Sequence, residues 1–119
     1  MTVNKCPKCG HRPNPRTLEE NSLSHVWYME IAYQLSDTPE NVKAECKLRF
    51  GVPILRVENE EFREQYDRLI KQRFTYEEKL DLMKWFPVTS LMTKGQMARY
   101  LNDIQAEYAS QGVILEAVA

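Results

Sequence analysis

The sequence contains little of what most catalytic and membrane proteins need. It has only four glycines and two histidines in 119 residues. It contains no glycine-rich phosphate loop, no G-x-S-x-G nucleophile motif and no H-E-x-x-H zinc motif. No apolar run approaches the roughly 20 residues of a membrane span, and the first ten residues lack the apolar core of a secretory signal. We therefore expect a non-catalytic, soluble protein of the cytoplasm.

Cysteine is also scarce. Three cysteines without a targeting segment are typical of a reducing compartment rather than of a secreted disulfide scaffold. A chain of this length buries about two-thirds of its unfolded surface, so it needs no metal or disulfide merely to fold. We expect residues 1–16 to form a basic arm and residues 17–119 to form a single domain.

The charge is unevenly distributed along the chain. The net charge is −1, yet the four basic residues of the first 17 positions have no acidic neighbour there, and all 17 acidic residues follow. A basic arm on a mildly acidic body is typical of a polyanion-binding protein, and many solvated termini have the same composition. Arg12 and Arg16 lie in the proline-rich arm, so they are the cations least committed to packing.

Helix-start signals and apolar repeats divide the domain into about five helices. Capping boxes of the form T-x-x-E or T-x-x-Q begin at Thr17, Thr75 and Thr93. Apolar residues then recur at helical spacing. The predicted helices run from Thr17 to about Leu35, from Asp37 until Gly51 and Pro53, from about Glu60 to Arg73, from Thr75 until Pro87, and from Thr93 until Gly112.

Short extended segments are expected between these helices. Ile54–Val57 is a short β-rich run, Val88–Met92 has the pattern of a short strand, and Val113–Leu115 that of a final extended piece. The predicted fold class is therefore helix-dominated α+β, with about five helices and two or three short strands, preceded by a C-x-x-C arm or knuckle.

Cys6 and Cys9 form the C-x-x-C knuckle, whose spacing lets two thiolates point at one zinc ion. Neighbouring cations would favour the thiolate forms. Zinc needs four ligands, and no second C-x-x-C exists. The candidates for the remaining positions are His11, His25, Cys46, or the Cys6 and Cys9 of a second protomer. Cys46 is also interpreted as a core residue and His25 as a partly buried histidine. A redox role is less favoured because no strand leads into the motif.

Two E-x-K triplets resemble half of a metal-dependent nuclease site. They are Glu45-Cys46-Lys47 and Glu77-Glu78-Lys79. Both lie inside predicted helices and lack a companion acid on a preceding strand that could share a magnesium ion. Neighbouring Glu and Lys residues on helices usually form solvated faces. We keep a nuclease as the second alternative function.

Nucleic-acid binding is better supported, because single-strand binders combine cationic grooves with aromatic platforms. Arg68, Lys71 and Arg73 close the third predicted helix, where cations also complement the helix dipole. The candidate platforms of the first helix are Trp27, Tyr28 and Tyr33, for which the simplest interpretation is core packing.

Residues 16–35, RTLEENSLSHVWYMEIAYQL, resemble the helix-opening motif of the phage NinB/Orf recombination-mediator family, Arg-Ser/Thr-x-x-Gln-Asn before an aromatic-rich helix. Arg16, Thr17 and Asn21 match the motif, and Glu20 stands where Gln is usual. The segment TSLMTKGQMARYLNDIQAEYASQGVIL resembles the last module of that family. The likeness covers about residues 16–115 and does not include the Cys6/Cys9 knuckle.

This resemblance implies a non-catalytic recombination accessory protein. Members are regarded as homodimers that bind DNA, prefer single strands, and help load an annealing or strand-exchange protein onto DNA coated by single-strand-binding protein. It implies that Arg16 and Asn21 contact DNA, whereas the Glu20 carboxylate would repel phosphate and suits a capping box. The alternative that remains is a small zinc-binding protein–protein adaptor.

Overall fold

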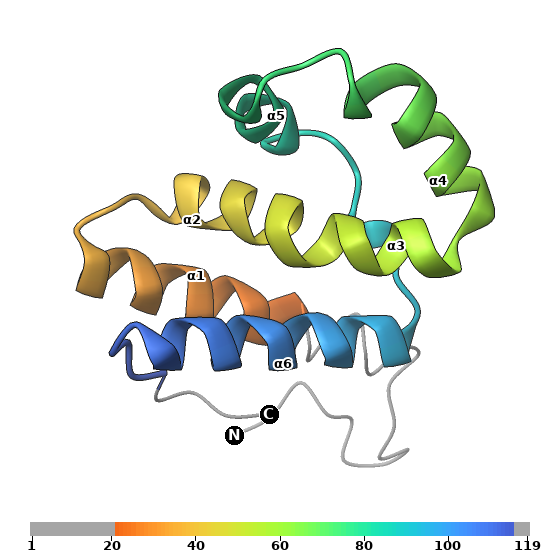
Figure 1. Ribbon diagram of the computed structural model, residues 1–119. Helices are drawn as coiled ribbons and strands as arrows, with labels where there is room; N and C mark the ends of the chain where they lie inside the picture. The colour runs from red at the N-terminus through yellow and green to blue at the C-terminus, as the bar shows by residue number, and fades with distance from the viewer. Residues whose placement is uncertain (1–20, 116–119) are drawn as a thin grey trace.

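The computed structural model describes residues 21–115, which form helices and turns (Figure 1). α1, the α2–α3 run and α6 pack together, while α4 and α5 lie beyond the α2–α3 run. The elements are α1 (Asn21–Leu35), α2 (Pro39–Cys46), the π-helical η2 (Lys47–Gly51), α3 (Val52–Glu58), α4 (Glu60–Tyr66), the π-helical η3 (Asp67–Lys71), α5 (Tyr76–Met83), the 3-10 turn η4 (Thr89–Leu91) and α6 (Lys94–Ser110).

The predicted α+β class is wrong, because the described residues contain no strand. Ile54–Val57 lies inside α3, and Val88–Met92 contains η4 instead of a strand. Val113–Leu115 follows α6 without regular structure. A short apolar run can be a strand or part of a buried helix, so its pattern does not distinguish the two structures. The predicted C-x-x-C arm and the Thr17 capping box lie outside the described residues.

The predicted helix end at Gly51 and Pro53 is also wrong. One helical run extends from Pro39 to Glu58, and its centre widens into the π-helix η2. There the N–H of Val52 donates to the carbonyl of Lys47, five residues back. A proline ring collides with the carbonyl four residues earlier in a regular α-helix, and a wider turn before Pro53 relieves this collision. The helix therefore changes its hydrogen-bond pattern rather than ending.

The signals at Thr75, Thr93 and Gly112 predicted the observed helix termini. The Thr75 and Thr93 hydroxyls each accept a backbone N–H at 3.2 Å, from Glu78 and Gln96. The Glu78 and Gln96 side chains accept the threonine N–H groups in return, at 2.8 and 3.0 Å. Gly112 follows α6 with a φ of +86°, as its predicted place past the helix end requires. Both capping boxes and this helix end are confirmed.

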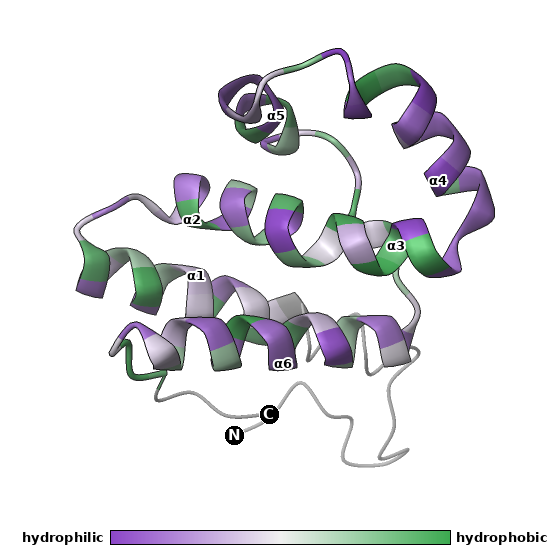
Figure 2. Ribbon diagram, viewed as in Figure 1, coloured by the Kyte–Doolittle hydropathy of each residue, from purple (hydrophilic) through white to green (hydrophobic). Residues whose placement is uncertain are grey.

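The core lies between α1, the α2–α3 run and α6. Its fully buried side chains include Ile31, Leu55, Met97 and Ile104. Hydrophobic and hydrophilic residues alternate along α1 and the α2–α3 run, whereas hydrophilic residues cover most of α4 (Figure 2). Among the described helices none is long and apolar enough to cross a bilayer.

Buried tyrosines join the core helices. The Tyr28 and Tyr100 hydroxyls are 2.7 Å apart and connect α1 to α6. The Cys46 thiol lies 4.0 Å from the Tyr108 hydroxyl and connects α2 to α6. All four side chains are at most 2% exposed. Polar groups buried this deeply need such partners, so the tyrosines fix how α6 sits on α1 and α2.

Alanine at Gly51 and at Gly95 is expected to change stability in opposite directions. A Cβ at Gly51 would lie 2.7 Å from Cγ1 of Val88, a buried β-branched side chain that cannot turn away. The overpacking cost of about 1–3 kcal/mol should exceed the helix-propensity gain of about 1 kcal/mol. A Cβ added at Gly95 would meet no other part of the described chain within 4 Å, so Gly95→Ala should stabilise by up to about 1 kcal/mol.

Urea unfolding of the two variants and the wild type measures both effects. Gly95→Ala is the control for the intrinsic helix preference of alanine. A Gly51→Ala protein as stable as the wild type would contradict the close packing of η2 against Val88.

Candidate nucleic-acid interface

Three of the predicted DNA-contacting residues come together where η3 turns toward α5. Arg68 and Lys71 belong to η3, and Arg73 lies in the turn that follows. All three side chains are exposed, and within residues 21–115 none of them forms an ion pair. We call Arg68, Lys71 and Arg73 the cationic corner.

The helix that carries the corner begins with acidic residues and ends with basic ones. The Asn59 side chain caps α4 by accepting the N–H of Phe62 at 3.0 Å. Glu60 and Glu61 occupy the first turn, and Arg68 and Lys71 lie in the last turn of the η3 extension. Acids at a helix start and bases at its end both complement the helix dipole. The same arrangement concentrates positive charge at the α5 end.

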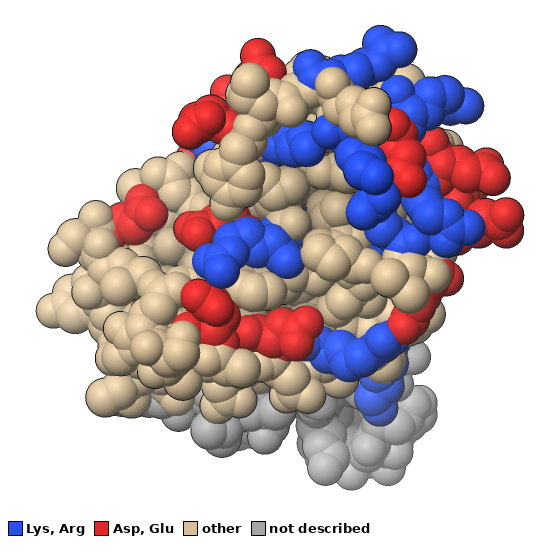
Figure 3. All heavy atoms as spheres, viewed as in Figure 1, with Lys and Arg blue, Asp and Glu red and all other residues tan. Residues whose placement is uncertain are grey.

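Two further arginines belong to α3 and α4, and the one on α3 already holds a carboxylate. The Arg56 guanidinium donates to the Asp67 carboxylate at 2.7 Å, and Arg63 donates to the Arg56 carbonyl at 3.0 Å. The Arg56 hydrogen bond, with the charges of Lys71 and Arg63, lowers the pKa of Asp67. Several cations thus share one carboxylate. Figure 3 shows Lys and Arg side chains gathered over this part of the surface, with Asp and Glu toward the outer edge.

Two arginines elsewhere in residues 21–115 are paired with carboxylates. Arg49 lies 3.2 Å from the Glu45 carboxylate and 3.3 Å from that of Glu107. Arg99 pairs with Glu58. A cation that already holds a carboxylate must release it before it can bind phosphate. The cations of the corner form no ion pair within residues 21–115, so they need not break one with these residues before they bind phosphate.

Exposed aromatic side chains lie beside the corner. Phe74 follows Arg73 directly and is 41% exposed, and Trp85 is 71% exposed. Both line a hollow of about 250 Å³. Of the three candidate platforms on α1, Trp27 and Tyr28 are buried in the core, at 3% and 2% exposure. Tyr33 is 87% exposed, so its core-packing interpretation is wrong, and it lines a different hollow along α1 and not the one beside the corner.

Sequence reasoning missed Trp85, which falls off the apolar repeat of its predicted helix. That departure from the repeat was the available signal, because an aromatic residue outside the buried stripe must face solvent.

Of the remaining predicted site residues, Asn21 is the one that the described chain contains. Asn21 is the first residue of α1, a different element. Arg12, Arg16, Cys6 and Cys9, with His11, lie outside the described residues, so their roles stay predictions.

The candidate zinc ligands of the described chain do not converge. Cys46 is fully buried, and burial raises the pKa of its thiol to about 12, as expected of a core residue. His25 is exposed and meets Tyr28 edge-on, with ring centroids 5.7 Å apart. Among residues 21–115 no three His, Cys, Asp or Glu side chains are placed to hold a metal ion.

The E-x-K triplets do not assemble a site either. Glu45 pairs with Arg49, whereas Lys47 turns inward and its amine donates to the carbonyls of Met83 and Phe86 at 2.6 Å each. Lys47 therefore caps the end of α5. Burial, with a smaller effect of Lys43, lowers its pKa to about 8. Sequence reasoning missed this role, because nothing in a single lysine distinguishes a buried amine from a solvated one.

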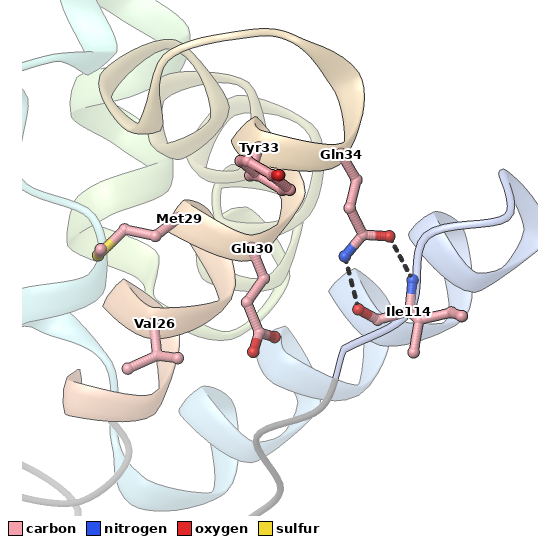
Figure 4. A pocket seen from close by; sticks show the side chains of 6 residues that line it. All are labelled: Val26, Met29, Glu30, Tyr33, Gln34 and Ile114. Carbon is pink, nitrogen blue, oxygen red and sulfur yellow. Dashed lines mark hydrogen bonds between the residues drawn. The ribbon is translucent and has the colours of Figure 1, made fainter.

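A second hollow follows α1 and differs in chemistry (Figure 4). Val26, Met29, Tyr33 and Ile114 line it, and Glu30 is the charged residue of the lining. The Gln34 amide closes one end by donating to the Ile114 carbonyl at 2.7 Å and accepting its N–H at 2.8 Å. This lining offers phosphate no cation, so DNA binding is better supported at the cationic corner.

Comparison with known proteins identifies no relative of this chain. No protein-family model, curated protein or solved structure matches this chain. The resemblance to the NinB/Orf family over about residues 16–115 therefore stays a hypothesis from the sequence.

Proposed function

We propose that this protein binds single-stranded DNA in the cytoplasm as a non-catalytic recombination accessory protein, and that it helps load a recombinase or annealing protein. The resemblance at residues 16–35 suggests the recombination role and a homodimer. One structural observation supports the DNA-binding part. Arg68, Lys71 and Arg73 are exposed and form no ion pair within the described chain, and they lie next to exposed aromatic rings.

The binding energy would come from two sources. Each lysine or arginine that meets a phosphate releases condensed counterions, which makes affinity depend on salt. Each base that stacks on an aromatic ring adds about 1–3 kcal/mol without requiring a particular sequence. Single strands present both groups at once, because their bases are not held in a duplex. The corner and its neighbouring rings therefore suit a single strand better than a duplex.

Removing two corner cations should weaken binding and make it less sensitive to salt. With a fluorescent single-stranded oligonucleotide, we expect Arg68→Gln/Arg73→Gln to lower affinity about ten-fold at low salt. The slope of log affinity against log salt should become shallower by about 1.4, at about 0.7 per lost contact. Anisotropy titrations at several salt concentrations measure both quantities.

The matched control is Lys43→Gln/Lys94→Gln, which changes the net charge equally on α2 and α6. Its slope should stay that of the wild type. A wild-type slope near zero, or equal losses in both double variants, would overturn the proposal.

A further inference from the structure

The hollow beside the cationic corner combines apolar and acidic groups. Phe74, Leu82 and Trp85 supply apolar surface, and Glu78 and Asp81 supply carboxylates. Phe74 comes directly after Arg73, so the hollow begins where the corner ends. A strand held by the corner would pass its next nucleotide over this hollow. The two carboxylates make it hostile to phosphate, which leaves the base as the group that fits.

Both carboxylates retain an oxygen that can accept hydrogen bonds. One oxygen of Glu78 accepts the N–H of Thr75 at 2.8 Å in the capping box. One oxygen of Asp81 lies 3.4 Å from the amine of Lys84, and the Asp81 side chain is 80% exposed. The capping box fixes where Glu78 stands, so this acceptor is positioned before any ligand arrives.

We propose that the hollow holds one unpaired base of the bound single strand and favours guanine. This inference rests on the proposed function. The rings of Phe74 and Trp85 provide stacking surface, as in other single-strand binders. The carboxylates of Glu78 and Asp81 accept hydrogen bonds from the edge of the base.

Guanine suits a carboxylate better than the other bases do. Its Watson–Crick edge carries the N1–H and N2–H donors side by side, so one carboxylate can accept both. Cytosine and adenine each offer an exocyclic amino group. Thymine presents a single N3–H between two carbonyl oxygens, which repel a carboxylate. The expected order is guanine, then cytosine and adenine, then thymine.

Four oligonucleotides test this order: an all-thymine strand, and the same strand with one central guanine, cytosine or adenine. We expect the wild type to bind the guanine probe about five- to ten-fold more tightly than the all-thymine probe. Glu78→Gln/Asp81→Asn should abolish this preference, while affinity for the all-thymine probe stays the same or rises. Glutamine also completes a capping box, so α5 keeps its start in this variant.

The stacking part has its own variant. Trp85→Ala should weaken binding of every probe about ten-fold, and Trp85 is too exposed for its loss to disturb the core. Tyr33→Ala is the matched control, because Tyr33 is 87% exposed and lines the α1 hollow instead. Its affinities should equal those of the wild type.

The outcomes separate this inference from the proposed function. Equal, salt-dependent binding of all four probes would overturn the base-binding hollow and leave DNA binding by the corner standing. A guanine preference that survives Glu78→Gln/Asp81→Asn, or a Trp85→Ala protein that binds like the wild type, would also overturn it. Absence of binding to any probe at low salt would overturn both.

Discussion

Replacing Tyr100 by alanine is expected to cost about 3–5 kcal/mol of unfolding free energy. Its ring is fully buried, and its hydroxyl lies 2.7 Å from that of Tyr28. A Cβ at Gly51 would lie 3.4 Å from the same ring, so the ring also packs against η2. Its removal leaves a cavity where α1, η2 and α6 meet. Domains of this size have about 5–15 kcal/mol in total, so the variant should be barely folded.

Tyr100→Phe separates packing from hydrogen bonding. This variant keeps the ring and removes only the hydroxyl, so we expect a loss of about 1 kcal/mol. Urea unfolding followed by circular dichroism measures both variants. Equal losses in Tyr100→Phe and Tyr100→Ala would mean that the hydroxyl pair, and not the ring, holds the helices together.

Alkaline pH should destabilise the domain, because its buried cysteine and tyrosines resist losing their protons in the folded state. Burial raises the pKa of Cys46 from 9.0 to about 12, and it raises the pKa values of Tyr28, Tyr100 and Tyr108 above 10.0. The folded state therefore keeps protons that the unfolded state has lost. The contribution of these groups to the free energy of unfolding is fully present below about pH 9. Above the unfolded-state pKa of each group, its contribution falls by about 1.4 kcal/mol per pH unit.

Lys47 contributes with the opposite sign. Its pKa falls from 10.5 to about 8 on folding, because burial opposes its charge. The folded state then binds fewer protons than the unfolded state between these values, so its contribution to stability increases from about pH 8 to 10.5. We expect stability to stay level or rise slightly up to about pH 9 and to fall steeply above pH 10, where the tyrosines dominate.

Urea unfolding between pH 7 and pH 11 gives this profile, and absorbance of ionised tyrosine shows when the buried phenols titrate. Lys47→Met should remove the slight rise below pH 9 and leave the steep fall above pH 10. A stability that is constant to pH 11 would contradict the burial of the three tyrosines and Cys46.

The helix starts were predictable because they depend on neighbours in the sequence. The Thr75 and Thr93 boxes need only residues three positions apart, and Gly112 needs only its own freedom of φ. Gly51 and Pro53 have the same local appearance as a helix end. They lie inside a helix because the π-helical turn accommodates Pro53 and because Gly51 lets Val88 and Tyr100 approach closely.

In the candidate interface, too, some features follow from the local sequence and others depend on the packing of distant elements. Arg68, Lys71 and Arg73 are near each other in the chain, so their convergence follows from the end of a single helix. The burial of Trp27 and Tyr28 and the inward turn of Lys47 depend on elements far away in the sequence.

The sequence by itself determined most of the helical segments, the helix starts at Thr75 and Thr93, the end of α6 and the cationic corner, because these follow from interactions within a few residues. Only the tertiary structure decided that Ile54–Val57 is helical and that Lys47 caps α5. Each of those outcomes depends on which surface a distant helix covers. Burial of that kind is a property of the packed chain and is not encoded in any short stretch of it.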